Sequence, residues 1–188
     1  MLIVVMLMSI LAAVALPSAM PSLHEQLVGA AQIVAADLSY GRSLAVLNND
    51  TYQFLFDRGN NQYTLQYAGG NSALAALPPS PFQSPQDPAT QYIVRLGQLP
   101  RVGVPVALYD VQQLTPAPVE ATAVSFGPLG STVQSQPTVI WLSAGAGSAK
   151  RYISVSLNAT TGLATIGGFQ AIAPPAAAAA SSSSSSGS

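Results

Sequence analysis

The first 23 residues contain no charged side chain, and this feature limits most strongly how the chain can fold. Between Met1 and Leu16 the only polar side chain is Ser9. A helix that spans a bilayer needs about 20 apolar residues, so a few more residues upstream would complete a span. Water solvates such a segment poorly, and lipid or other protein must cover it. The sequence therefore predicts a membrane or filament-core helix over residues 1–22.

Two prolines follow the apolar block closely. Pro17 and Pro21 each lack a backbone donor and disfavour helical geometry in the residue before them. We therefore expect a kink at this point. Ser22 can cap a new helix, and Glu25 lies three residues later, the spacing of a capping box.

The segment from Leu23 to Leu47 has helical periodicity. Gln26, Asp37 and Arg42 are expected off its apolar stripe, and Asn48 begins the polar run that ends it. If both helical parts are continuous, the helix is roughly 70 Å long. The stripe consists of these residues: Leu23, Leu27, Ala30, Ala31, Val34, Leu38 and Ala45, widened by Ile33, Leu44 and Leu47.

After Asp50 the period changes to two, which indicates strands. A helix followed only by strands predicts an α+β fold, with the helix packed on an antiparallel sheet or a small β-sandwich. The head is expected over residues 23–173. The Ala/Ser tail at 174–188 has nothing to bury and is expected to be disordered. The predicted strands are Thr51–Phe56, Gln62–Tyr67, Tyr92–Leu96, Val104–Val111, Ala121–Phe126, Thr138–Leu142, Tyr152–Leu157 and Leu163–Ile166, with a long loop at Gly69–Thr90.

Composition argues against several classes of function. Charged residues make up 7% of the chain, against about a quarter in a typical soluble domain, and the net charge is −1. This is not the basic surface of a nucleic-acid-binding protein. Cysteine is absent, so disulfides and thiolate metal sites are excluded.

No group of residues has the pattern of a catalytic or metal site. His24 is the single histidine and has Glu25 beside it, but no nucleophile is near in sequence, so a solvated helix position is expected. Asp57–Asn61 has too few carboxylates for calcium and is predicted to be a hairpin turn. Gly145–Lys150 lacks the spacing of a phosphate loop. We therefore predict a non-enzymatic protein without cofactor or metal.

The apolar block resembles a known family. Met1–Pro17 is similar to the N-terminal helix of type IV pilins and type II secretion pseudopilins, and Ala12-Ala13-Val14-Ala15-Leu16-Pro17 matches the close of that helix. In the family a basic leader ending in Gly, a Phe and a Glu precede this run. Counted back from Pro17, the Glu falls immediately before Met1. We therefore expect Met1 to be an internal residue, with leader and Glu encoded upstream.

The head resembles one branch of the same family, the H-type minor pseudopilins and their FimT-like fimbrial relatives. Ala36–Ala45, which includes Arg42 and Ser43, is similar to the end of their helix, with Leu44 in place of a Glu. Phe126, Pro128 and Gly130 match a Phe-x-Pro-x-Gly turn. Thr161 and Gly162 match the closing strand, Thr-Gly, strand hairpin.

The resemblance implies a structural subunit of a type II secretion pseudopilus or a type IV pilus-like filament. It implies a single pass through the bacterial inner membrane and a periplasmic or extracellular head. Its implied partners are other pilin or pseudopilin subunits, an inner-membrane assembly platform and, for a leader upstream, prepilin peptidase with N-terminal methylation. Pro17 and Pro21 would form the kink. The implied assembly helix comprises Met1, Leu2, Ile3, Val4, Val5, Leu7, Ile10, Leu11, Ala12, Ala13, Val14 and Leu16.

Two other functions fit parts of the sequence. A membrane-anchored binding module or adhesin would not polymerise and would carry a concave aromatic surface, to which Tyr63, Tyr67, Tyr92 and Tyr109 could contribute. Alternating aromatic residues in strands are more often structural. A secreted enzyme would need a cleaved signal and clustered acid and base residues, which the scarcity of His, Asp and Glu disfavours.

Overall fold

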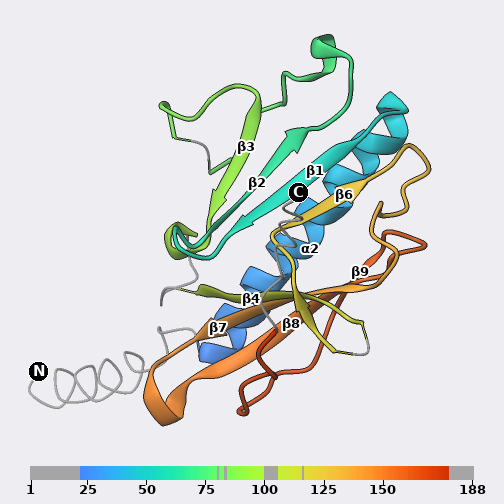
Figure 1. Ribbon diagram of the computed structural model, residues 1–188. Helices are drawn as coiled ribbons and strands as arrows, with labels where there is room; N and C mark the ends of the chain where they lie inside the picture. Colours follow the sequence, from blue (N-terminus) through green and yellow to red (C-terminus); the bar gives the residue numbers. More distant parts are fainter. Residues whose placement is uncertain (1–21, 80, 83, 100–105, 116, 178–188) are drawn as a thin grey trace, which may run out of the picture.

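The computed structural model describes residues 22–79, 81–82, 84–99, 106–115 and 117–177 (Figure 1). Within these residues one long helix is followed by nine strands in two antiparallel sheets. The four-stranded sheet has the order β3-β2-β1-β6, and the five-stranded sheet has the order β5-β4-β7-β8-β9. The predicted α+β class is confirmed, with two sheets sharing one helix.

The helix α2 spans Leu23–Asn48 and begins at the predicted capping box. Its last residue is followed by Asn49, which takes the left-handed conformation and closes the helix through its backbone N–H. The strands are β1 (Tyr52–Asp57), β2 (Gln62–Tyr67), β3 (Gln91–Arg95), β4 (Ala107–Gln113), β5 (Val119–Glu120), β6 (Ala123–Phe126), β7 (Thr138–Ala144), β8 (Arg151–Leu157) and β9 (Ala164–Ile166).

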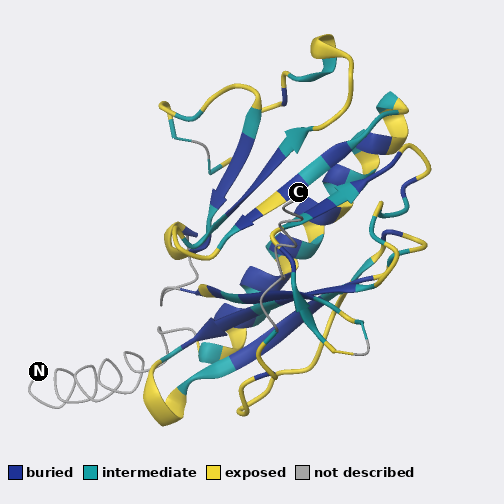
Figure 2. Cartoon of the chain, viewed as in Figure 1, coloured by how far each residue is buried: buried dark blue, intermediate teal, exposed yellow. Residues whose placement is uncertain are grey.

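The core lies between α2 and the two sheets. In Figure 1 the helix runs along both sheets, beginning near β7 and β8 and ending near β1 and β6. The buried residues in Figure 2 follow the strands and the helix face that meet there. Gly41 allows the closest approach, because a Cβ at this position would lie 2.4 Å from the Phe54 ring. The helix therefore rests directly on the aromatic side chains of β1.

The buried arc of α2 is wider than the apolar stripe, and two expectations about it were wrong. Gln26 and Asp37 are buried, although both were expected off the stripe. Leu47, which was included in the stripe, is 80% exposed. Two sheets cover more of the helix than one sheet would, and this brings polar positions into the core.

Side chains cap two open strand edges. The amide of Asn61 accepts from the backbone N–H of Leu108 at 2.7 Å and donates to the carbonyl of Val106 at 2.8 Å. The amide of Gln134 bonds Ser125 N and Ala123 O of β6 in the same way, at 3.2 and 3.3 Å. Each amide takes the place that a neighbouring peptide group would occupy, so it blocks pairing with another strand at that point.

The C-terminal segment crosses the five-stranded sheet. Gln170 pairs with Tyr152 of β8, and Gln112 of β4 donates to the carbonyl of Pro175 at 2.6 Å. Pro174 is buried, and the chain stays beside β4 as far as Ala177. The tail was expected to be disordered from Pro174, whereas the described chain stays in contact with the head over residues 174–177. Residues 178–188 lie outside the described residues.

The long loop before β3 is tied to the head. The Arg95 guanidinium holds Asp87 through two contacts of 3.0 and 2.6 Å, and Leu77 N donates to the carbonyl of Ala89. The loop contains one short 3-10 helix at Ser72–Leu74. The two-residue strand β5 was not predicted, because two residues are too few to show a period.

Candidate functional site

The start of α2 is the point where the head meets the apolar block of the sequence. Ser22 N donates to the Glu25 carboxylate at 2.8 Å, and Glu25 N donates to the Ser22 hydroxyl at 3.3 Å. These two contacts lower the pKa of Glu25, first through the backbone bond to Ser22. The predicted capping box is confirmed. His24 is exposed as expected, and its ring also contacts the ring of Phe169 edge-on, with centroids 4.9 Å apart.

The predicted assembly residues between Met1 and Leu16, and the predicted kink at Pro17 and Pro21, lie outside the described residues. Within the described ranges, α2 is too polar over its length to qualify as a bilayer span, and no other helix there does so. The role of the apolar block therefore stays a prediction.

At the other end of α2, four of the family-like head residues come together. The Arg42 Nε atom donates to the carbonyls of Gly130 at 3.1 Å and Thr161 at 2.9 Å. A Cβ on Gly162 would lie 2.0 Å from the Gly130 carbonyl oxygen, and Gly162 has a φ of 64°. Only glycine fits this position without strain. Two loops that are distant in sequence thus meet on one helix side chain, and we name this group of four residues the Arg42 junction.

The other three head residues have different surroundings. Phe126 is fully buried on β6, with its ring edge-on to Phe54 at 6.1 Å. Pro128 is exposed in the turn that leads to Gly130. Ser43 is exposed on α2 and donates its hydroxyl to the carbonyl of Ser39 at 2.9 Å. These positions shape the turn and the core, and nothing in their contacts assigns them a binding role.

An apolar hollow of ≈ 390 Å³ lies beside the Arg42 junction. Its lining residues are Arg42, Ser43, Val46, Leu47 and Leu129. Leu129 is 89% exposed and Val46 is 46% exposed, so this end of the head shows large apolar side chains to the outside. Exposed apolar side chains that gather in one place are typical of surfaces that bind other proteins.

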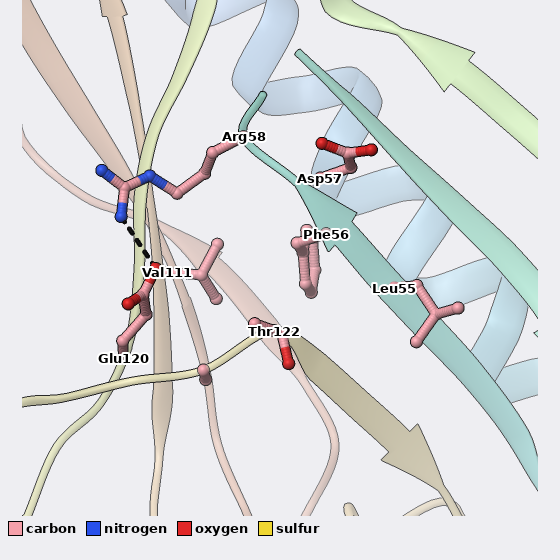
Figure 3. Close-up of a pocket in the computed structure, with 8 residues that line it drawn as sticks. Leu55, Phe56, Asp57, Arg58, Val111, Glu120 and Thr122 are labelled. Atoms are coloured by element: carbon pink, nitrogen blue, oxygen red, sulfur yellow. Dashed lines mark hydrogen bonds and ion pairs between the residues drawn. The ribbon is translucent and has the colours of Figure 1, made fainter. Parts of the chain in front are cut away.

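A second hollow, of ≈ 370 Å³, lies at the seam between the sheets (Figure 3). Figure 3 shows Arg58, from the β1–β2 turn, reaching across the seam to Glu120, with Phe56 and Val111 beneath. The Arg58 Nη1 atom lies 2.9 Å from the Glu120 carboxylate and 3.2 Å from that of buried Asp110. The guanidinium therefore connects the hairpin of one sheet to the edge of the other. This hollow has the features of a structural ion-pair site.

One carboxylate is buried between α2 and the four-stranded sheet. Asp37 accepts the hydroxyl of Tyr63 at 2.5 Å and the hydroxyl of Tyr92 at 3.1 Å. Burial raises the pKa of Asp37, although both tyrosine bonds oppose the shift. Burial also raises the pKa of Tyr63 well above its ordinary value. This cluster was not expected from the sequence, in which Asp37 was placed off the apolar stripe. The signal that points to it is a charged residue at a helix position next to that stripe.

Three of the tyrosines named for a possible binding surface, Tyr63, Tyr67 and Tyr92, share one face of the four-stranded sheet, and their hydroxyls are used for contacts within the head. Tyr63 and Tyr92 are buried with their hydroxyls on Asp37. Tyr67 donates to Asp50 at 2.5 Å. Tyr109 lies on the other sheet, where the Lys150 ammonium sits 4.9 Å from its ring centroid. These positions do not support the aromatic surface that an adhesin would need.

The acidic turn and the glycine loop have plain structural explanations. Asp57 accepts from the backbone and side chain of Asn60 at 2.9 and 2.6 Å, which closes the predicted hairpin turn. Gly147–Ala149 forms a short 3-10 helix between β7 and β8. Among the described residues, no group of three or more His, Cys, Asp or Glu residues could hold a metal ion.

No protein-family model matches the sequence, and no curated protein is similar to it. The comparison with solved structures finds two crystal structures of the type IV minor pilin FimU from Pseudomonas aeruginosa. The first has a TM-score of 0.46 and 12% identity, and the match covers 78% of this chain and 88% of that one. The second has a TM-score of 0.43 and 14% identity, and covers 74% and 91% of the two chains.

Proposed function

We propose that this protein is a non-enzymatic structural subunit of a type IV pilus-like filament or a type II secretion pseudopilus. The observation that carries the proposal is the junction at Ser22. A charge-free block ends there in the sequence, and a capped helix begins whose apolar face packs on the two sheets over most of its length. A block of this length without charge is poorly solvated by water, and we infer that lipid or other subunits cover it.

In the proposed mechanism the subunit is first held in the membrane and is then assembled into a filament. In a bilayer, a helix satisfies its own backbone hydrogen bonds, as lipid requires. In a filament the same helices would bundle, and the small residues Ala12, Ala13 and Ala15 would allow close approach. Pro17 and Pro21 would form a joint between this core and the head. The low charge of the chain suits heads that pack against one another.

By the same resemblance, an inner-membrane platform would assemble the filament, and prepilin peptidase would process a leader encoded upstream. The head would then lie in the periplasm or outside the cell. Mass spectrometry of the native N-terminus tests this part of the proposal. A methylated Phe upstream of Met1 is the expected result. A native chain that begins near Ser22 would contradict it.

A charge in the apolar block tests assembly directly. We expect Leu11→Asp to abolish filaments sheared from cells, because an ionised residue in a helix bundle or bilayer is strongly unfavourable. Ala36→Asp is the matched control, since Ala36 is exposed on α2 and should leave filaments intact. Filaments that survive Leu11→Asp would contradict assembly through this segment.

A further inference from the structure

The two ends of α2 carry different exposed surfaces. The C-end patch consists of Arg42, Val46, Leu47 and Leu129. The N-end patch consists of His24, Glu25 and Phe169. The helix residues of the two patches are centred about 20 positions apart, so the patches lie about 30 Å apart along its axis. Neither patch is part of the packing between α2 and the sheets, and both are open to a partner.

The C-end patch combines apolar surface with a free positive charge. Leu47 and Leu129 are 80% and 89% exposed and line the same hollow as Arg42. Arg42 uses its Nε atom for the two carbonyls of its junction. Its two Nη groups have no hydrogen-bond or ion-pair partner in the described ranges of the chain. A partner for this patch should therefore offer an apolar side chain next to an acid.

The N-end patch has that chemistry. Phe169 is 38% exposed and packs edge-on against His24. Glu25 is exposed beside them, and no Arg or Lys of the described chain forms a salt bridge with it. Its carboxylate is already ionised more easily than usual, because the Ser22 bonds lower its pKa. A negative charge and an aromatic ring thus stand together at this end.

We propose that the C-end patch of one copy docks on the N-end patch of a second copy, so that heads contact one another head to tail along the helix direction. Pairing of two C-end patches would bring two Arg42 guanidinium groups together, which is unfavourable. Pairing of unlike patches instead places Arg42 opposite Glu25. Such a contact is heterologous and leaves a free patch at each end, so it continues from copy to copy. The inference rests on the proposed filament function and specifies the contact between heads.

Disulfide trapping tests this contact, because the chain has no cysteine of its own. Two differently tagged full-length chains, one with Leu129→Cys and one with Phe169→Cys, are produced together in cell membranes and treated with a mild oxidant. We expect the mixed disulfide to form at least about tenfold faster than a control pair in which Leu114→Cys replaces Leu129→Cys, because an interface raises the effective concentration of the two thiols. Leu114 is exposed and belongs to neither patch.

A charge variant provides the second readout. Glu25→Gln keeps an acceptor for the capping box and removes only the charge. We expect it to slow the mixed disulfide about threefold or more, as a lost charge pair slows association. Asp57→Asn, which removes an exposed carboxylate from the β1–β2 turn, should leave the rate unchanged.

The outcomes separate this inference from the proposed function. A mixed disulfide no faster than the Leu114→Cys control overturns the head-to-tail contact, and filaments in the same cells would leave the filament function standing. Predominance of a Leu129→Cys homodimer also overturns it, in favour of contact between like patches. Fast mixed trapping in cells without filaments supports the head contact and contradicts the filament function.

Discussion

The two sheets build their halves of the core from different residues. The buried aromatic side chains of the central core cluster lie on the four-stranded sheet, whereas the five-stranded sheet contributes aliphatic ones such as Ile140, Leu142 and Val155, and its buried Tyr152 lies outside the cluster. The aromatic half includes tyrosine hydroxyls, and these allow the buried carboxylate of Asp37. The aliphatic half packs on α2 through β7, β8 and β9, and the Arg42 junction joins its β8–β9 loop and the loop after β6 to the helix. One helix is thus held by a buried carboxylate on one side and by aliphatic packing on the other.

The largest expected effect tests how much each half contributes to stability. Phe54→Ala should lower the free energy of unfolding by about 3–5 kcal/mol, because the ring fills the space over Gly41 and the helix backbone cannot collapse into the cavity. Leu142→Ala in the other sheet should cost about 2–4 kcal/mol. Urea denaturation of the full-length chain in mild detergent measures both. A larger loss for Leu142→Ala would reverse this ranking of the two halves.

The Arg42 junction should be the next most sensitive point. Gly162→Ala forces a Cβ against the Gly130 carbonyl in a left-handed conformation, so we expect a loss of about 1–3 kcal/mol. Gly168→Ala is the control, since its Cβ would meet open space. The same denaturation assay distinguishes them. Equal stability of the two variants would show that the junction adjusts to the added Cβ without cost and does not stabilise the attachment of the five-stranded sheet to α2.

The features behind these predictions differ in how far the sequence alone could reveal them. Local signals were sufficient for the Ser22 cap, the helix and most strands, because each depends on residues a few positions apart. The Asp37 cluster and the Arg58 contacts were not predictable, since their partners lie 26 to 62 positions away. Arg42 was singled out by resemblance, but only the fold shows that its Nε atom joins two loops.

The pH dependence of stability should distinguish the half of the core that contains Asp37 from the half built by the five-stranded sheet. Burial raises the folded pKa of Asp37 above the unfolded value of about 3.9, so the folded state binds the proton more tightly. The stabilisation that comes from protonated Asp37 is fully present below the unfolded pKa and is lost as the pH rises through the folded pKa. We expect Asp37→Asn to flatten the decline in stability above about pH 4. An unchanged pH profile would mean that Asp37 is not the titrating group.

The smallest expected effect is at the helix start, which lies beside the five-stranded sheet. Ser22→Ala should cost about 1 kcal/mol, because it removes the acceptor for Glu25 N. Ser22→Asp retains an acceptor and serves as the control. Amide hydrogen exchange should speed up over residues 23–27 and stay unchanged over residues 41–48. Faster exchange along the whole helix would mean that α2 separates from both sheets in one step.

Under the proposed filament function, subunits would accumulate beside copies of one another, and the amides of Asn61 and Gln134 then have a further consequence. Molecules crowded in one layer before assembly meet often, and exposed strand ends can then join into cross-β aggregates that do not come apart. The two amides occupy backbone groups of β4 and β6 that such growth would use. Strand pairing between neighbouring copies is therefore disfavoured at these places, which would leave growth of the proposed filament to the surfaces proposed for head contact.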